Sequence, residues 1–375
     1  MSHTKNIHFL PPELYPHIAE SLIDDRRSLR AFALTCRAWR AVGQGFLFRR
    51  ISVTGERRFY ELMWLLDAHP EAGVWIHELC VSTLFERPQN DWIYTIPVLL
   101  PTRLTALHTL TFRNVTDLME YDEEKFFPGL SPAFPSIRTL NVMDCTLPLA
   151  AFIDYLSLLR NLDSLLIEGF RLPNTVTVRR DFTSQEHPWE GLVVPSSSCV
   201  ARLRSFALCR SSTHACPTNN FVRWLGHASG LRSLSLDINR HQDLQNVGRL
   251  INAIGPSLEN LGLGIYTQDY SFTEYINLSS CTSLRTFALR PSHFSPIPLL
   301  SQLVSPHLRK ITLIDILERH IHPPLCALFR KSVFAAVEIF IVSTRCKEFS
   351  EPMMCMMAEL SAHLIYSQNR LLLEH

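Results

Sequence analysis

Apolar residues along this 375-residue chain fall into one repeated pattern. The pattern is Leu-x-x-Leu-x-Leu, in which Ile, Val or Phe also occupies the apolar places. Its ten copies start at Phe48, Ile76, Leu107, Ile137, Leu162, Leu203, Leu231, Leu258, Leu284 and Leu308, and a weak eleventh copy starts at Ala336. Successive starts of the ten copies lie 24 to 31 residues apart, except for one interval of 41. A repeat of this period indicates structural units that stack on one another.

Each copy predicts a short strand, because its fourth and sixth places are apolar and the places between them are mostly polar. Amphipathic stripes between the copies predict helices, for example over 59–66, 149–156 and 250–254. Only neighbouring copies can cover these apolar faces, which favours a curved solenoid with a parallel inner sheet and outer helices. The copies resemble leucine-rich repeats, and the copy that starts at Ile137 includes the typical Cys place at Cys145. The resemblance implies an α/β fold with an irregular leucine-rich-repeat domain over 49-375.

A different pattern precedes the first copy. Three apolar stripes with helical spacing predict three short helices, and their residues are Leu14, Ile18 and Leu22, then Leu29, Phe32, Ala33 and Cys36, then Trp39, Val42, Phe46 and Leu47. Pro12 suits a first helical turn, and Asp24, Asp25 and Ser28 supply turn and N-cap chemistry between the first two stripes. Three helices over about forty residues bury little apolar area, so we expect a partner or the rest of the chain to cover part of this module.

These helices resemble an F-box. The matching residues are Leu10, Pro11, Glu13 and Leu14 in its Leu-Pro-x-Glu-Leu opening, and Cys36, Trp39 and Phe48 in its Cys-x-x-Trp and closing aromatic. The resemblance implies a helical module over 1-48 that binds the Skp adaptor of a Skp, cullin and F-box (SCF) ubiquitin ligase. The adaptor contacts that it implies are Leu10, Pro11, Leu14, Ile18 and Leu29. We expect Cys36 and Trp39 to belong to the core of the module instead. A helical cap without a partner is the alternative interpretation.

The junction between the helical module and the first copy, and the longest segments between copies, also allow predictions. Phe48 ends the helical module and starts the first copy, so no flexible linker separates the two parts. The acidic segment 117–135 and the segment 171–198 fall outside the repeat and predict exposed loops. We interpret the long loop 171-198 as an insertion in preference to a binding loop.

Strand positions between the apolar places must point to the opposite, inner face of the sheet. Their residues are mostly small and polar, and the candidate substrate face is Thr109, Thr111, Arg113, Thr139, Asn141, Ser233, Ser235 and Asp237. Crowding on a concave face also favours short side chains whatever the ligand. Arginines recur at the second place of the copies, namely Arg49, Arg138, Arg204, Arg232, Arg285 and Arg309. They could hold an acidic or phosphorylated segment, although solvated arginines paired with loop carboxylates are the more ordinary case.

Composition and motifs exclude several classes of protein. A net charge of +1 and the lack of a basic stripe on the inner face argue against nucleic-acid binding. Phosphate-loop, zinc-protease and hydrolase signatures are absent, and no His or Cys spacing suits zinc, so we expect no catalytic residue, metal or cofactor. No apolar run reaches the length of a membrane span, and ten irregularly spaced cysteines suit reduced thiols, so we expect a cytoplasmic or nuclear protein that does not bind membranes.

These observations together predict a non-catalytic subunit of an SCF ubiquitin ligase. The helical module would bind the Skp adaptor and, through it, the cullin, while the repeats bind a protein substrate whose identity the sequence does not specify. The alternative is a leucine-rich-repeat scaffold that acts without ubiquitination.

Overall fold

The computed structural model describes most of the chain from Leu10 to Tyr366. The described residues are 10–83, 91–115, 134–146, 149–170, 202–209, 218–267, 272–291, 294–314, 323–329, 334, 337–342 and 364–366. They group into two compact units, Met1–Thr139 and Leu140–His375. Most of the segment 117–135 and the whole loop 171–198 lie outside the described residues, so their predicted exposure stays a prediction.

Three helices begin unit 1, as the apolar stripes predict. They are α1 (Leu14–Ser21), α2 (Arg26–Thr35) and α3 (Arg37–Arg49). Asp25 caps α2, because its carboxylate accepts hydrogen bonds from the backbone N–H groups of Arg27 and Ser28. The core of the module is small and consists of Ala19, Leu29 and Phe32 with partly buried side chains around them.

Phe32 stacks on Trp39 with ring centroids 4.6 Å apart, which places Trp39 against this core as expected. Cys36 is exposed, so its predicted core position is wrong. It separates α2 from α3 in an extended conformation, where its side chain does not follow the helical stripe.

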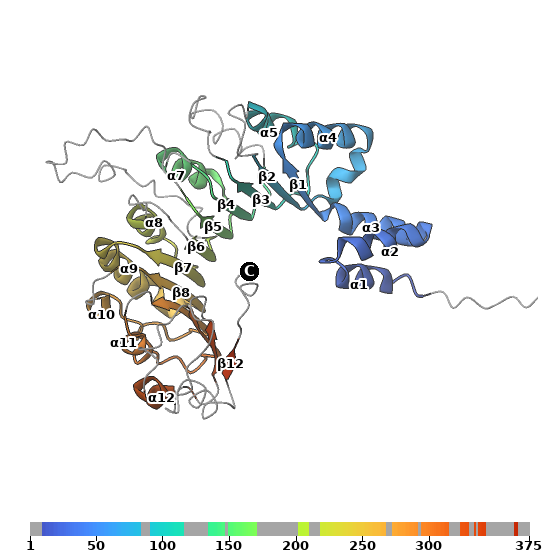
Figure 1. Cartoon of the computed structure of the whole chain (residues 1–375). Coiled ribbons are helices and arrows are strands. Elements are labelled where there is room, and N and C mark those ends of the chain that lie inside the picture. Colours follow the sequence, from blue (N-terminus) through green and yellow to red (C-terminus); the bar gives the residue numbers. More distant parts are fainter. Residues whose placement is uncertain are drawn as a thin grey trace, which may run out of the picture. The chain divides into compact units, whose positions relative to one another are not determined.

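The remainder of unit 1 follows α3 without a linker. Its elements are β1 (Arg50–Thr54), α4 (Gly55–Ala68), η1 (Pro70–Trp75), β2 (Glu78–Ser82), η2 (Asp91–Thr95), α5 (Ile96–Leu99) and β3 (Thr109–Arg113). β1 pairs with β2 and β2 with β3, in parallel, and each strand follows its predecessor in the chain. Figure 1 shows these strands in blue and green with α4 and α5 beside them.

Unit 2 continues the same arrangement (Figure 1). Its first strand, β4 (Thr139–Met143), begins at the last residue of unit 1. Its other strands are β5 (Ser164–Glu168), β6 (Ser205–Cys209), β7 (Ser233–Ile238), β8 (Asn260–Ile265), β9 (Thr286–Pro291), β10 (Lys310–Ile314), β11 (Glu338–Val342) and β12 (Leu364–Tyr366). They neighbour one another in chain order, and the pairs from β5 to β12 are parallel. The intervening helices are α7 (Leu149–Leu158), α8 (Thr218–Leu225), α9 (His241–Ile254), η5 (Gly255–Ser257), α10 (Phe272–Tyr275), α11 (Ile297–Leu300) and α12 (Pro323–Phe329). The longer helices lie along one face of the sheet, so the opposite face is the inner one.

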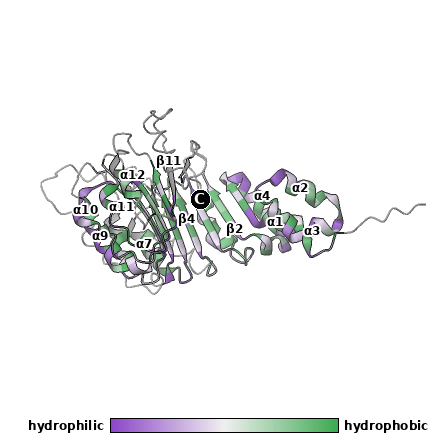
Figure 2. Ribbon diagram, turned by 90° about the horizontal axis from the view of Figure 1, so that it is seen from below, coloured by the Kyte–Doolittle hydropathy of each residue, from purple (hydrophilic) through white to green (hydrophobic). Residues whose placement is uncertain are grey.

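The sequence pattern and the strands agree residue by residue. From β2 to β11, each strand begins two residues after the start of its copy. The three apolar places of the nine copies from Ile76 to Leu308 are all at most 5% exposed. In Figure 2 the strands are mostly green or pale, and hydrophilic purple residues gather on helices such as α9 and α10. The prediction of a parallel sheet with outer helices is therefore confirmed.

Two features differ from the pattern. The first copy starts inside a helix, because Phe48 still belongs to α3, and only Val53 of that copy is fully buried. The strand β12 is additional, since no copy predicts it.

Candidate partner-binding surfaces

The first predicted adaptor contacts form an exposed apolar start of α1. Leu10 and Leu14 are each 41% exposed, and Pro11 beside them is also exposed. The Leu14 N–H donates to the Pro11 carbonyl at 3.0 Å, and the Tyr15 hydroxyl donates to the Leu10 carbonyl at 3.0 Å. These bonds use backbone oxygens, so they fix the segment against α1 and leave the Leu10 and Leu14 side chains accessible.

The other two predicted contacts lie deeper. Ile18 is half-buried against the core of the module, and Leu29 is only 1% exposed. Leu29 supports the α1 surface from inside and offers no side-chain area to a partner in this conformation.

The candidate substrate face is divided between the two units. Thr109, Thr111 and Arg113 lie on β3 of unit 1, and Thr139 ends that unit. The members in unit 2 are Asn141 on β4 and Ser233, Ser235 and Asp237 on β7. Arg113 is exposed and Asp237 is 7% exposed, whereas the other members are half-buried. Members of this face that share a strand lie close together. The half-buried members leave part of each side chain accessible to a partner.

A polar cluster that the sequence reasoning missed surrounds Asp237. Tyr266 and Arg290 belong to it, because the Arg290 guanidinium donates to the Tyr266 hydroxyl at 3.0 Å. Gly264 is the neighbour of Asp237 on β8, and a Cβ at Gly264 would clash with the Asp237 carboxylate oxygen. Asp237 and Tyr266 therefore converge over Gly264, where a Cβ would force the Asp237 side chain to shift. The signal in the sequence is the seventh place of successive copies, which holds Asp237, Gly264 and Arg290 in turn.

Burial and charge in this cluster raise the pKa of two side chains, Cys209 and Tyr266. Burial, with the Asp237 charge, raises the pKa of the Cys209 thiol to about 11. Burial also raises the pKa of Tyr266, again with a contribution from Asp237, and the hydrogen bond from Arg290 opposes it. Both groups stay protonated at neutral pH, so the cluster offers hydrogen-bonding groups and no reactive thiolate.

The residue at the second place of each copy lies directly after the first apolar residue and just before the strand. In each unit these residues form a row across the amino-terminal ends of the strands. We call these residues the second-place row. In unit 2 the Glu259 carboxylate lies 3.2 Å from the Arg232 guanidinium and 3.6 Å from that of Arg285. The predicted pairing of the arginines with carboxylates is thus confirmed for these two, but the acid comes from the row itself.

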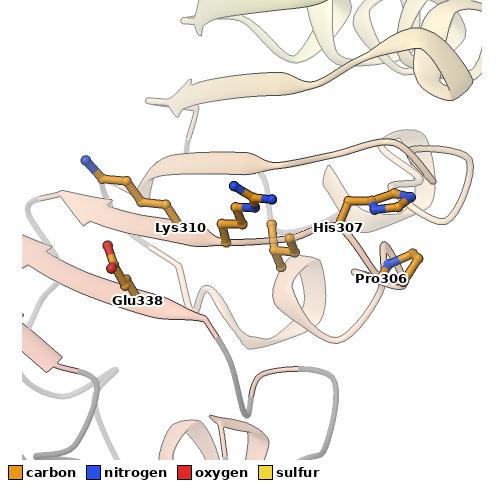
Figure 3. Close-up of a pocket in the computed structure, with 6 residues that line it drawn as sticks. Pro306, His307, Lys310 and Glu338 are labelled. Atoms are coloured by element: carbon orange, nitrogen blue, oxygen red, sulfur yellow. The ribbon is translucent and has the colours of Figure 1, made fainter.

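A cavity of about 480 Å³ lies farther along unit 2. Its lining residues are Pro306, His307, Leu308, Arg309, Lys310 and Glu338. Figure 3 shows Lys310 on β10 and Glu338 on the neighbouring strand β11, with His307 on the loop that leads into β10. The charged side chains are exposed and of both signs, so this cavity does not select one class of ligand.

The described part of the chain contains neither a candidate metal site nor a candidate membrane-spanning helix. No group of three or more His, Cys, Asp or Glu residues there could hold a metal ion. No helix there combines the length and the apolar character needed to cross a bilayer.

The repeat and the structure together define the class: an α/β repeat protein with a parallel sheet and outer helices, consistent with a leucine-rich-repeat solenoid. No model of a known family and no curated protein matches the sequence. Among solved structures, an internalin (InlF) from Listeria monocytogenes strain 4b F2365 is similar over 92% of this chain and 100% of that one, with 12% sequence identity and a TM-score of 0.30. The assignment of the class rests on the strands and the repeat, since a likeness at this TM-score does not bear on it.

Proposed function

We propose that this chain is a protein-binding repeat protein that acts as the substrate-recognition subunit of an SCF ubiquitin ligase. The single observation that carries the proposal is the exposed pair Leu10 and Leu14 at the start of α1, held in place by hydrogen bonds to the Leu10 and Pro11 carbonyls. They stand at the Leu-Pro-x-Glu-Leu opening that resembles an F-box.

The small core of the module supports a role in docking. Only Ala19, Leu29 and Phe32 are fully buried in its apolar cluster, while Leu34 is 76% exposed in addition to Leu10 and Leu14. Covering the exposed part of a leucine contributes on the order of 1 kcal/mol, so an adaptor that covers Leu10 and Leu14 would gain a useful part of its affinity there.

The inner strand face is the proposed surface for the protein substrate. Its half-buried Ser and Thr residues can form hydrogen bonds with a partner, as can Asp237. Tyr266 and Arg290 add a tyrosine and an arginine, two residue types that often dominate the binding energy of interfaces. The chain itself would catalyse nothing. It would accelerate transfer by raising the effective concentration of a target lysine beside the ubiquitin-charged enzyme.

A scaffold that binds the same partners without ubiquitination is the second candidate. The exposed module and the strand face suit it equally, so recruitment of the cullin is what separates the two functions.

The test is co-purification of the full chain with the Skp adaptor and the cullin. The variant is Leu10→Ala with Leu14→Ala, and the matched control is Leu158→Ala, which removes the side chain of a leucine that is 48% exposed on α7. We expect the double variant to weaken adaptor capture by about tenfold and the control to leave it unchanged. Circular dichroism would verify that all three proteins fold alike.

Each outcome separates the candidates. Capture of adaptor and cullin by the unmodified chain and by Leu158→Ala, but not by the double variant, supports the ligase subunit. Capture of the adaptor without the cullin favours the scaffold. If the folded chain captures neither protein, the proposal is wrong.

A further inference from the structure

Four basic residues occupy the second-place row of unit 1 without an acid among them. They are Arg49, His77, His108 and Arg138, one from each of the first four copies. The His77 and His108 rings meet edge to face with centroids 5.3 Å apart, so the side chains of adjacent copies are in contact. The backbone joins them as well, since the N–H of each of the last three donates to the carbonyl of the residue before it in the row.

Electrostatic repulsion acts along this row. Burial lowers the pKa of His108, and the nearby His77, Arg49 and Arg138 lower it further. Glu78 is the one acid that opposes these effects on His108, but its carboxylate already accepts a hydrogen bond from Arg50 at 2.6 Å.

The two arginines of the row lack a compensating charge. No carboxylate of the described chain lies within ion-pair distance of Arg49 or Arg138. The Nε atom of Arg49 is buried and has no hydrogen-bond acceptor there. Unit 2 differs, because Glu259 lies between Arg232 and Arg285 in its row and neutralises part of the charge. The unit 1 row therefore has two arginines without a paired carboxylate and two histidines between them.

We propose that this line, Arg49, His77, His108 and Arg138, is a docking site for an acidic helical segment of a partner protein. Neighbouring strands lie about 4.8 Å apart, so the row presents a basic side chain at roughly that interval. Carboxylates at positions i, i+3 or i+4 of a helix lie about 5–6 Å apart, which fits the row better than alternate side chains of an extended peptide at about 6.8 Å. Arginine binds carboxylates through two parallel hydrogen bonds, so Arg49 and Arg138 can each bind one carboxylate of such a helix. This site is separate from the exposed leucines of α1 and does not depend on the proposed ligase function.

The experiment measures binding of a labelled Glu-rich helical peptide to the full chain by fluorescence anisotropy. The same peptide with Gln in place of Glu is the control for charge. The variants are Arg49→Gln with Arg138→Gln, against the matched pair Arg232→Gln with Arg285→Gln in the neutralised row. A DNA duplex serves as a competitor, because phosphates would also be attracted to arginines.

We expect the unmodified chain to prefer the Glu peptide and the unit 1 variant to lose about tenfold in affinity for each arginine removed. The unit 2 pair should change the affinity little.

Three results would overturn the inference. The Gln peptide could bind as well as the Glu peptide, the unit 2 pair could weaken binding as much as the unit 1 pair, or the duplex could bind more tightly than the peptide. Thermal unfolding of each variant would show that a loss of affinity does not reflect a loss of fold.

Discussion

Phe48 stacks on Trp75, with ring centroids 6.2 Å apart and ring planes inclined by 27°. Phe48 lies in the last turn of α3, and Trp75 ends η1 after the first repeat helix. The contact therefore joins the helical module to the first repeat, where α3 passes into β1 without a linker.

Trp75→Ala should lower the free energy of unfolding by about 2 kcal/mol, because it removes this ring contact and the apolar area around it. Urea unfolding would measure the loss, and hydrogen exchange in α1 to α3 should accelerate. Trp75→Phe keeps a ring and should recover much of the stability. An alanine variant as stable as the unmodified chain would mean that the module does not depend on this contact.

Two glycines of α3 should respond oppositely to alanine. A Cβ at Gly43 would lie 2.7 Å from the Ala33 Cβ on α2, whereas a Cβ at Gly45 meets nothing within 4 Å. Gly45→Ala should stabilise the protein by about 0.5–1 kcal/mol through helix propensity, and Gly43→Ala should destabilise it by about 1–3 kcal/mol through overpacking. Thermal or urea unfolding of both variants checks the prediction, which equal effects of the same sign would contradict.

Asp243 should make the stability depend on pH. It is 1% exposed in α9, its Oδ2 atom has no hydrogen-bond donor within the described residues, and burial raises the pKa of its carboxyl to about 6. An aspartate of the unfolded chain titrates near pH 4, so the folded state binds more protons between about pH 4 and 6. The contribution of this residue to stability therefore falls as the pH rises through that window and stays low above it.

Asp243→Asn should remove this loss. We expect the variant to be more stable by about 2 kcal/mol at neutral pH and equal to the unmodified chain below about pH 4. Urea unfolding at several pH values measures the difference. A difference that does not change with pH would indicate that the carboxyl is not the titrating group.

Glu259→Gln should alter binding more than stability. Its two arginine partners are exposed, so loss of both ion pairs should cost at most about 1 kcal/mol. Arg232 and Arg285 would then lack a carboxylate, and we expect the Glu-rich peptide to gain a second site on unit 2. Anisotropy in the Arg49→Gln, Arg138→Gln background would detect that site separately, and no gain in binding there would contradict the prediction.

The repeat predicted the strands accurately because three buried places in each copy leave little freedom in register. Ile76, Leu79 and Val81 illustrate this, since all three are at most 1% exposed and β2 begins between the first two. The strand β12 was missed because three residues outside any copy carry no pattern.

The sites were less predictable, because they depend on which side chains meet across neighbouring strands. The arginines of the second-place row are visible in the sequence, but the partner of Arg232 and Arg285, Glu259, occupies the same place and breaks the run of arginines. His77 and His108 also interrupt that run. Burial of Leu29 under α1 also required the packed module, since a helical stripe does not reveal which apolar residue lies innermost.

The backbone of the second-place row has a consequence for how such a surface can change. Most of these residues are fixed through their own N–H and carbonyl, as when Arg232 donates to Arg204 and accepts from Glu259. Any residue except proline can make those bonds, so the fold places few requirements on the side chain at this position. Single substitutions can therefore change the charge along the row, one copy at a time, without changing the strands.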